Sequence, residues 1–315
     1  MARKSAKRLA SVFALITLAS CSNSTETTSK PTQTTDSPAV ELPVVVVTYS
    51  VLGDIVSQLL GNQAVVDVVI PDGQDPHEFQ PSAKDVEALN NAEFVVSNGL
   101  GFEENLEDVL NNAVNSDKRV FMVGDHVTVL KTSEELGQDH SADQEHGHGG
   151  IDPHLWLSPA TILEMLPALT AALSDALDVD LTNSSAALST ELKELDAEIE
   201  KNISDLGRCD LVTGHDEMAY FANRYGCRIV GALIPSFTTT SEATAGELAD
   251  LKELVARYKV PAIFTGLGTN GEVAEQLAKE LGVKVVTLST HYLDDATNYQ
   301  GFMRNLVAQI TEALK

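Results

Sequence analysis

The chain has 315 residues, which is enough for two modest domains with separate cores. It carries 21 Lys and Arg against 46 Asp and Glu, a formal net charge of −25. A chain this acidic repels nucleic acid and anionic lipid surfaces, so nucleic-acid binding is excluded as a function.

The N-terminus has the pattern of an export signal. Basic residues at positions 3, 4, 7 and 8 precede the short apolar run Leu9–Ser20. This run is shorter than the ~20 residues that a membrane-spanning helix needs, so residues 1–20 are predicted to be a signal peptide. The run ends in Leu-Ala-Ser-Cys, which resembles a bacterial lipobox with Cys21 as the lipidated residue. An ordinary secretory signal with a chance cysteine is the alternative.

The segment after the signal is polar. Residues 22–40 are rich in Ser, Thr and Pro and cannot bury enough apolar surface to fold, so 21–41 is predicted to be a lipidated flexible tether. Without the four leader cations, 17 Lys and Arg face 46 Asp and Glu, a formal charge of about −29. We expect an exported, monomeric protein, held at the outer face of the bacterial cell membrane by its N-terminal lipid alone.

From position 44 the chain alternates Val-rich runs with helical stretches, which predicts an α/β fold with parallel strands. Predicted strands are 44–50, 64–71, 93–99 and 119–125, and predicted helices are 51–61, 82–92 and 101–114. A His-rich loop at 134–150 and an apolar helix at Pro159–Leu177 follow. We assign 42–181 to an N-terminal lobe.

The segment 182–206 is polar around most of its circumference. Leu or Ile recurs at 188, 192, 195, 199, 203 and 206, in steps of three and four residues. This spacing gives one apolar stripe along a helix of about 37 Å, at 1.5 Å per residue. We predict that 182–207 is a helix linking two lobes; an ordinary amphipathic helix within one domain is the alternative.

The second half repeats the alternation. Predicted strands are 209–214, 227–234, 260–266 and 283–289, and predicted helices are 216–226, 242–259, 271–282 and a last one from Asn298. The predicted fold class is therefore α/β, with two lobes that each hold a roughly four-stranded parallel sheet flanked by helices, joined by one long helix. The C-terminal lobe is 208–315. Cys209 and Cys227 each begin a predicted strand, and export favours a disulfide between them over two buried free thiols.

Four histidines lie where the loops follow predicted strands or precede a helix: His77, His154, His215 and His291. Ligands of open parallel sheets bind beyond the carboxyl ends of the strands, and each half supplies two of these rings. Neutral imidazole is the usual protein ligand of Zn²⁺, and a closed site takes four donors. The pattern predicts a metal site between the lobes, although any single histidine of this kind could be a loop or capping residue.

The His-rich loop has a different composition. His140, His146 and His148 lie among Gly, Ser, Asp, Gln and Glu, with no large apolar residue to anchor the backbone. These rings are predicted either to collect metal loosely or to stay solvated, and they are not assigned to the main site.

The motifs DPHEFQPS, IDPHLWLSP, TGHDEMAYFANRYG and YQGFMRNL, in this order and spacing, resemble the zinc/manganese solute-binding lipoproteins of bacterial ABC importers. The resemblance extends from about Val44 to the end. It implies two α/β lobes, a buried metal between them and delivery to a membrane permease, with no enzymatic activity. It also implies that His77, His154 and His215 are ligands, and that a histidine at the third position goes with zinc where a glutamate goes more often with manganese.

The sequence departs from the family pattern at two positions. Many relatives have an aspartate as the fourth ligand, whereas this region reads LSTHYLDDATNY. His291 is the best candidate for the fourth ligand, with Asp294, Asp295 and Glu78 or a water as alternatives. Relatives also often carry Glu where this chain has Gly266, which removes an acid that could partner a histidine.

Other functions fit less well. GLGTNG at 266–271 has the spacing of a dinucleotide-binding loop, but no acid follows about 20 residues later to bind a ribose. A zinc hydrolase would need a base such as Glu78 or Glu217 beside an open metal position; there is no H-E-x-x-H motif, and Glu217 is expected to leave the opposite side of a helix start from His215. A surface adhesin with an incidental metal is compatible with transport.

Overall fold

The first half of the chain forms the predicted parallel sheet. The computed structural model describes residues 42–115, 119–131 and 150–315. The strands are β1 (Val44–Tyr49), β2 (Val65–Ile70), β3 (Phe94–Ser97) and β4 (Val120–Met122), in the spatial order β2-β1-β3-β4 with every pair parallel. β3 and most of β1 are buried, which explains the continuous valine runs.

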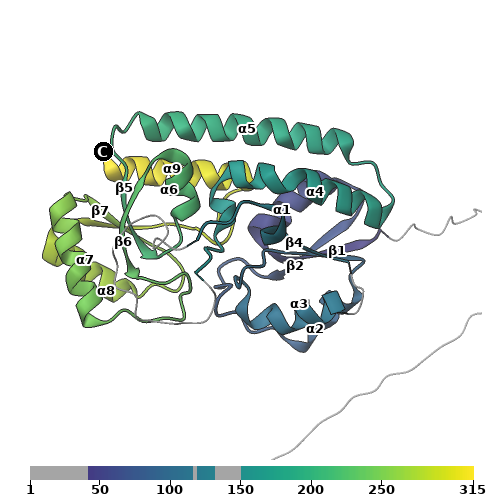
Figure 1. The fold of residues 1–315 in the computed structure, drawn as a ribbon, viewed down its shortest axis with the longest axis horizontal. Coiled ribbons are helices and arrows are strands. Elements are labelled where there is room, and N and C mark those ends of the chain that lie inside the picture. The colour runs from purple at the N-terminus through teal and green to yellow at the C-terminus, as the bar shows by residue number, and fades with distance from the viewer. Residues whose placement is uncertain (1–41, 116–118, 132–149) are drawn as a thin grey trace, which may run out of the picture. The chain divides into compact units, whose positions relative to one another are not determined.

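Four helices accompany this sheet (Figure 1): α1 (Ser50–Leu60), α2 (Ala83–Asn91), α3 (Glu107–Asn115) and α4 (Pro159–Leu177). The start of α4 has local causes, because the Ser158 side chain accepts a hydrogen bond from the Thr161 amide and Pro159 occupies the first turn. By length and composition alone α4 could cross a membrane, but it packs an apolar face into the protein core. The predicted bounds of α4 are confirmed.

The second half also holds four strands: β5 (Asp210–His215), β6 (Arg228–Ile234), β7 (Ala262–Thr265) and β8 (Lys284–Thr287). Their helices are α6 (Ala219–Tyr225), α7 (Ala245–Tyr258), α8 (Gly271–Leu281) and α9 (Tyr299–Leu314). Within the described residues these strands pair as two parallel ladders, β5 with β6 and β7 with β8, so they do not form one continuous hydrogen-bonded sheet. The α/β class with parallel sheets is confirmed.

The predicted disulfide joins Cys209 to Cys227, immediately before β5 and β6. The Arg228 amide donates a hydrogen bond of 2.7 Å to the Cys209 carbonyl at the same place. The bridge therefore fixes the start of β5, the strand whose last residue is His215.

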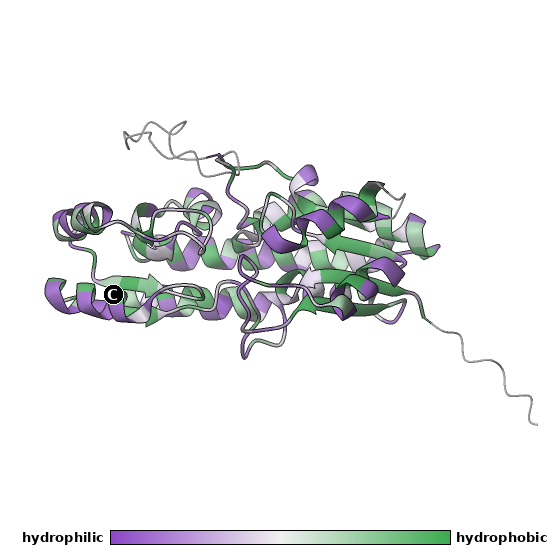
Figure 2. Cartoon of the chain, turned by 90° about the horizontal axis from the view of Figure 1, so that it is seen from below, coloured by the Kyte–Doolittle hydropathy of each residue, from purple (hydrophilic) through white to green (hydrophobic). Residues whose placement is uncertain are grey.

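The long helix α5 (Thr182–Ser204) runs along both halves of the folded chain (Figure 1). Its apolar stripe is buried as predicted, through Leu188, Leu192, Leu195, Ile199 and Ile203. Hydrophobic residues from both lobes join this stripe in one continuous core, while a smaller core lies within the C-terminal lobe. In Figure 2 the strands are coloured mainly hydrophobic, and the helices show hydrophobic and hydrophilic faces.

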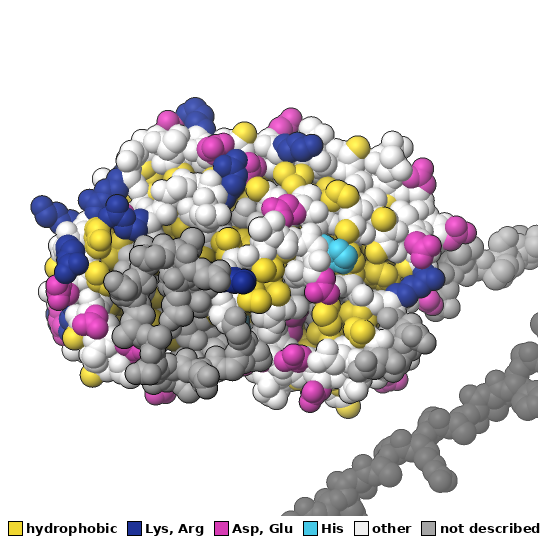
Figure 3. Space-filling model, in the orientation of Figure 1, with side chains coloured by type: hydrophobic (Ala, Val, Ile, Leu, Met, Phe, Trp, Pro, Cys, Tyr) yellow, Lys and Arg dark blue, Asp and Glu magenta, His cyan; other side chains and the backbone are white. Residues whose placement is uncertain are grey.

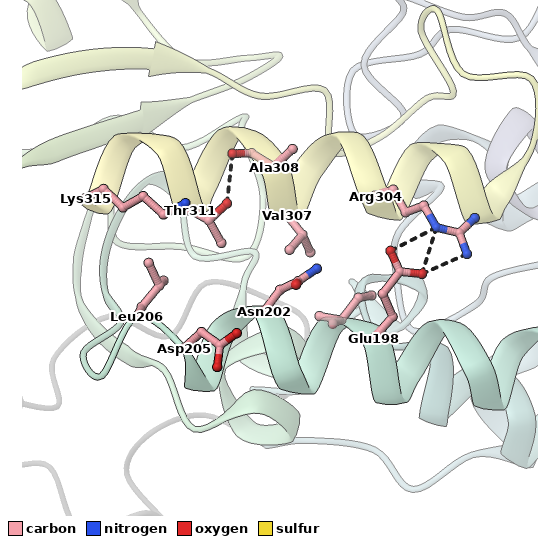
Figure 4. A pocket seen from close by; sticks show the side chains of 10 residues that line it. Glu198, Asn202, Asp205, Leu206, Arg304, Val307, Ala308, Thr311 and Lys315 are labelled. Carbon is pink, nitrogen blue, oxygen red and sulfur yellow. Dashed lines mark hydrogen bonds and ion pairs between the residues drawn. The ribbon is translucent and has the colours of Figure 1, made fainter.

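Polar contacts hold α5 against neighbouring helices near its start and in its second half. Ser184 donates a hydrogen bond of 2.6 Å to the Leu59 carbonyl of α1, and Arg224 of α6 pairs with Asp196. Glu198 pairs with Arg304 of α9, beside a groove of about 400 Å³ between α5 and α9 (Figure 4). Elsewhere, acidic side chains are scattered over the face in Figure 3 and lie beside basic ones in several places.

Candidate metal centre

The structure brings the four predicted histidines together from four separate segments. His77 lies in the loop between β2 and α2, and His154 directly precedes a short 3-10 helix that leads into α4. His215 is the last residue of β5, and His291 follows β8. All four side chains are almost completely buried, with at most 1% of each exposed. Each half supplies two rings, as the positions beyond strand ends predicted.

The two histidines of the first half share a local structure encoded by the tripeptide Asp-Pro-His. Asp75 accepts a hydrogen bond of 3.0 Å from the His77 amide, and Asp152 accepts one of 2.8 Å from the His154 amide. Such Asx turns, with the intervening proline restricting the backbone, fix the direction in which each histidine leaves its loop. Asp152 also contacts the ring itself, because its Oδ1 lies 2.8 Å from His154 Nδ1.

Hydrogen bonds tie the loops of the two lobes around the rings. Trp156 Nε1 donates to the Thr290 carbonyl at 2.7 Å, and Tyr299 donates to the Trp156 carbonyl at 2.7 Å. On another side, Thr239 donates to Asp75 Oδ2 at 2.8 Å. Gly268 lies beneath that contact, since a Cβ there would be 2.5 Å from Asp75 Oδ2. Gly268, with a φ of 71°, thus serves close packing at the site, which accounts for one glycine of GLGTNG without a dinucleotide.

Aromatic side chains complete the enclosure. Phe102 and Trp156 are fully buried, with ring centroids 5.1 Å from His77 and 5.4 Å from His154 respectively. Both also lie within 6.0 Å of the His291 ring. These apolar walls exclude water, which strengthens every electrostatic interaction inside the site.

The four rings are arranged as a near-regular tetrahedron. All six distances between their centroids fall between 4.9 and 5.8 Å. His154 Nε2 lies 3.3 Å from His77 Nε2 and 3.1 Å from His215 Nε2, and one nitrogen of every ring lies within 4.8 Å of the others. Zinc–nitrogen bonds of ~2.0–2.1 Å at tetrahedral angles place neighbouring nitrogens about 3.3–3.4 Å apart. The geometry therefore suits one tetrahedral cation.

An oxygen lies near the Nδ1 atom of each ring. Asp152 Oδ1 is 2.8 Å from His154 Nδ1, and Thr290 Oγ1 is 3.0 Å from His291 Nδ1. Glu104 Oε1 is 3.8 Å from His77 Nδ1, and Glu217 Oε2 is 3.8 Å from His215 Nδ1. Only the oxygens at His154 and His291 lie within hydrogen-bond distance of Nδ1. An N–H on Nδ1 that donates to such an oxygen leaves the inner nitrogen with a free lone pair.

Burial sets the protonation of the site. It lowers the pKa of His154, His215 and His291 well below the usual histidine value, and their mutual charge repulsion acts in the same direction. Burial also raises the pKa of Asp152 and of Glu217 to about 8. These three rings are thus held neutral, which is the form that binds metal, and a bound cation would favour the ionised form of the two carboxyls.

The other predicted residues lie outside this cluster. The alternatives for the fourth ligand are exposed: Asp294, Asp295 and Glu78. Among residues 42–115, 119–131 and 150–315, the four histidines are the only cluster of side chains that could hold a metal ion. The His-rich loop with His140, His146 and His148, and also Cys21, lie outside the described residues.

One sequence-based expectation is wrong. Glu217 does not point away from His215: its Oε2 lies 3.8 Å from His215 Nδ1 and 3.9 Å from His291 Nε2. The reason is that α6 begins only at Ala219, and the Glu217 amide instead turns back to donate to the His215 carbonyl at 3.0 Å. Asp152 and Phe102 were not singled out from the sequence; only the repeat of Asp-Pro-His offered a signal for Asp152.

This fold and this cluster define an α/β protein with parallel sheets and a buried cluster of four histidines, two from each half of the chain. The sequence profile of the family described as zinc-uptake complex component A, periplasmic, matches residues 45–313, so the chain belongs to that family. The resemblance to solute-binding proteins inferred from the four motifs is thereby confirmed.

Known relatives include proteins named for either of two metals. The chain is 29% identical over 248 residues to the zinc-binding lipoprotein AdcA of Streptococcus pneumoniae, covering 78% of this chain and 49% of the relative. It is 26% identical over 247 residues to the manganese-binding lipoprotein MntA of Halalkalibacterium halodurans, covering 76% of each. The chain thus spans about half the length of the zinc-binding relatives it matches.

The fold has solved counterparts. The periplasmic zinc-binding protein TroA of Treponema pallidum superposes with a TM-score of 0.73 at 25% identity, and the match covers 87% of this chain and 99% of that protein.

Proposed function

We propose that this chain captures Zn²⁺ between its lobes, with His77, His154, His215 and His291 as the four ligands, and delivers it to the permease of an ABC importer. The observation that carries the proposal is the tetrahedron of four buried rings, with one nitrogen of each within 4.8 Å of the others. Four unrelated segments would not bury four polar rings against one another without a cation to bind them. The family and the zinc-binding relatives support the same reading.

Zinc is favoured over manganese by the donor set. Imidazole nitrogen suits Zn²⁺, whereas Mn²⁺ prefers sites rich in carboxylate and carbonyl oxygen. None of the four clustered donors is a carboxylate. Manganese remains the second candidate because one relative is a manganese-binding lipoprotein. Elemental analysis of protein purified without added metal, followed by competition between Zn²⁺ and Mn²⁺, decides between them: preferential manganese binding would refute the zinc assignment.

A transport role fits the geometry better than catalysis does. Catalytic zinc sites keep three protein ligands and leave one position for water, whereas four rings close the coordination sphere. We therefore expect no hydrolysis of esters or phosphates by the zinc-loaded protein. The lobes that close on the metal would be 42–181 and 208–315, with 182–207 as the link, and we expect the protein to act as a monomer.

We also propose that the protein is exported and anchored through lipid on Cys21. The relatives that are named lipoproteins support this anchor. Replacing Cys21 with Ala should move the protein from the membrane fraction to the soluble extracytoplasmic fraction without changing its zinc affinity. A protein that stays in the membrane fraction after this change would refute lipid anchoring.

A further inference from the structure

Glu217 occupies a position that the four-ligand description leaves unexplained. The side chain is 3% exposed, and the turn in which its amide donates to the His215 carbonyl folds it back towards the site. Its Oε2 lies 3.8 Å from His215 Nδ1 and 3.9 Å from His291 Nε2. One carboxylate oxygen thus faces two of the four rings, both from the C-terminal lobe.

The three atoms that meet here are all unsatisfied. Within the described part of the chain, Glu217 Oε2, His215 Nδ1 and His291 Nε2 are buried and lack a hydrogen-bond partner. Buried polar atoms of this kind are costly, and three at one point indicate a missing group. A cation on the inner nitrogens supplies it, because His291 Nε2 then has the metal and His215, bound through Nε2, carries its proton on Nδ1 towards Glu217.

Thr290 connects the same carboxylate to His291. Its hydroxyl lies 3.0 Å from His291 Nδ1, and its side chain opposes the rise that burial causes in the pKa of Glu217. A hydroxyl can accept a hydrogen bond from an imidazole N–H while it donates its own proton to a carboxylate. Glu217 is thus placed beside His215 Nδ1, at 3.8 Å, and Thr290 is placed to link it to His291 Nδ1.

Gly266 leaves space around the Thr290 hydroxyl, so that this hydroxyl can bond to Glu217. A Cβ at Gly266 would lie 3.3 Å from Thr290 Oγ1, so a larger residue there would crowd the hydroxyl, and glycine leaves it free to bond Glu217. Two buried carboxyl groups face the rings, Asp152 at His154 and Glu217 at His215, and in their ionised form they would offset the two positive charges of a bound divalent metal.

We infer that Glu217 is a positioning residue of the metal centre: it accepts the Nδ1 proton of His215 directly and that of His291 through Thr290, so that both rings bind the metal through Nε2. The inference rests on the proposed metal-binding function. It predicts that His215 and His291 carry their protons on Nδ1, and it predicts that loss of Glu217 lowers the zinc affinity.

The test compares zinc affinity, by competition with a chelating indicator, for the parent protein, Glu217→Gln and the control Glu275→Gln. Glu275 is exposed on α8, so this control removes the same charge from the same lobe. Loss of a partner behind a ligating histidine lowers metal affinity by about 10–100-fold, so Glu217→Gln should lose that much while Glu275→Gln keeps the parent affinity. Long-range ¹⁵N–¹H spectra of the zinc-loaded parent should show Nδ1–H on His215 and His291.

Two results would overturn the inference: zinc affinity of Glu217→Gln equal to that of Glu275→Gln, or spectra of the parent in which either ring binds zinc through Nδ1. The spectra need only the parent protein, so they decide even if Glu217→Gln does not fold. A parent protein that binds no zinc would instead refute the proposed function.

Discussion

Replacing His215 with Ala removes one of the four rings and leaves the other three in place. His215 Nε2 lies 3.1 Å from His154 Nε2, at the short edge of the tetrahedron. Structural zinc sites contribute about 10–16 kcal/mol of binding free energy, so an equal share for each of four ligands is about 2.5–4 kcal/mol. At 1.4 kcal/mol per tenfold, zinc Kd should rise by about a hundredfold to a thousandfold.

The assay is a zinc competition titration, with thermal unfolding in the presence and absence of zinc as a second measure. Zinc raises the melting temperature of any protein whose folded state it binds preferentially, so the increase should shrink in His215→Ala. His126→Ala is the matched control, since His126 is an exposed ring that stacks on Phe121 away from the cluster. Equal zinc affinity in the two variants would refute the ligand assignment and with it the reasoning from ring geometry.

Further consequences follow from the same structure. Asp152→Asn should lower zinc affinity about 10–100-fold in a competition titration, because the amide cannot match the carboxylate behind His154, whereas the exposed Asp125→Asn should not. Zinc affinity should fall as pH falls from about 8 towards 5. Burial raises the pKa of Asp152 and of Glu217 to about 8, so below that pH the metal must displace protons that the metal-free protein retains. A zinc affinity that does not change with pH over this range would argue against this linkage. Cys209→Ala, which opens a bridge across 18 residues, should reduce the free energy of unfolding in denaturant by about 3 kcal/mol. Deleting 141–149 should leave tight zinc binding intact; its loss would move the site into the His-rich loop.

Much of this architecture could be predicted because its signals are local. Valine runs buried on both faces predict the strands, and the stripe of Leu and Ile at steps of three and four predicts α5. The meeting of the four histidines was also predictable, because parallel strands direct their carboxyl ends to one edge and each of these histidines lies near such an end or a helix start.

The surroundings of the four histidines were not predictable in the same way. Glu217 faces His215 because three residues of irregular backbone precede α6 and form a turn there instead of starting the helix at once. Thr290 and Phe102 reach the site through contacts between segments far apart in the sequence, which periodicity does not report. The pairing of the second-half strands into two ladders is likewise a tertiary outcome.

The metal assignment can be tested most directly by a crystal structure of the zinc-loaded protein measured at the zinc absorption edge. The account predicts one strong anomalous peak between the lobes, bonded at ~2.0–2.1 Å to a ring nitrogen of His77, His154, His215 and His291. A peak elsewhere on the chain, or one from which any of the four rings is turned away in favour of another ligand, would contradict it.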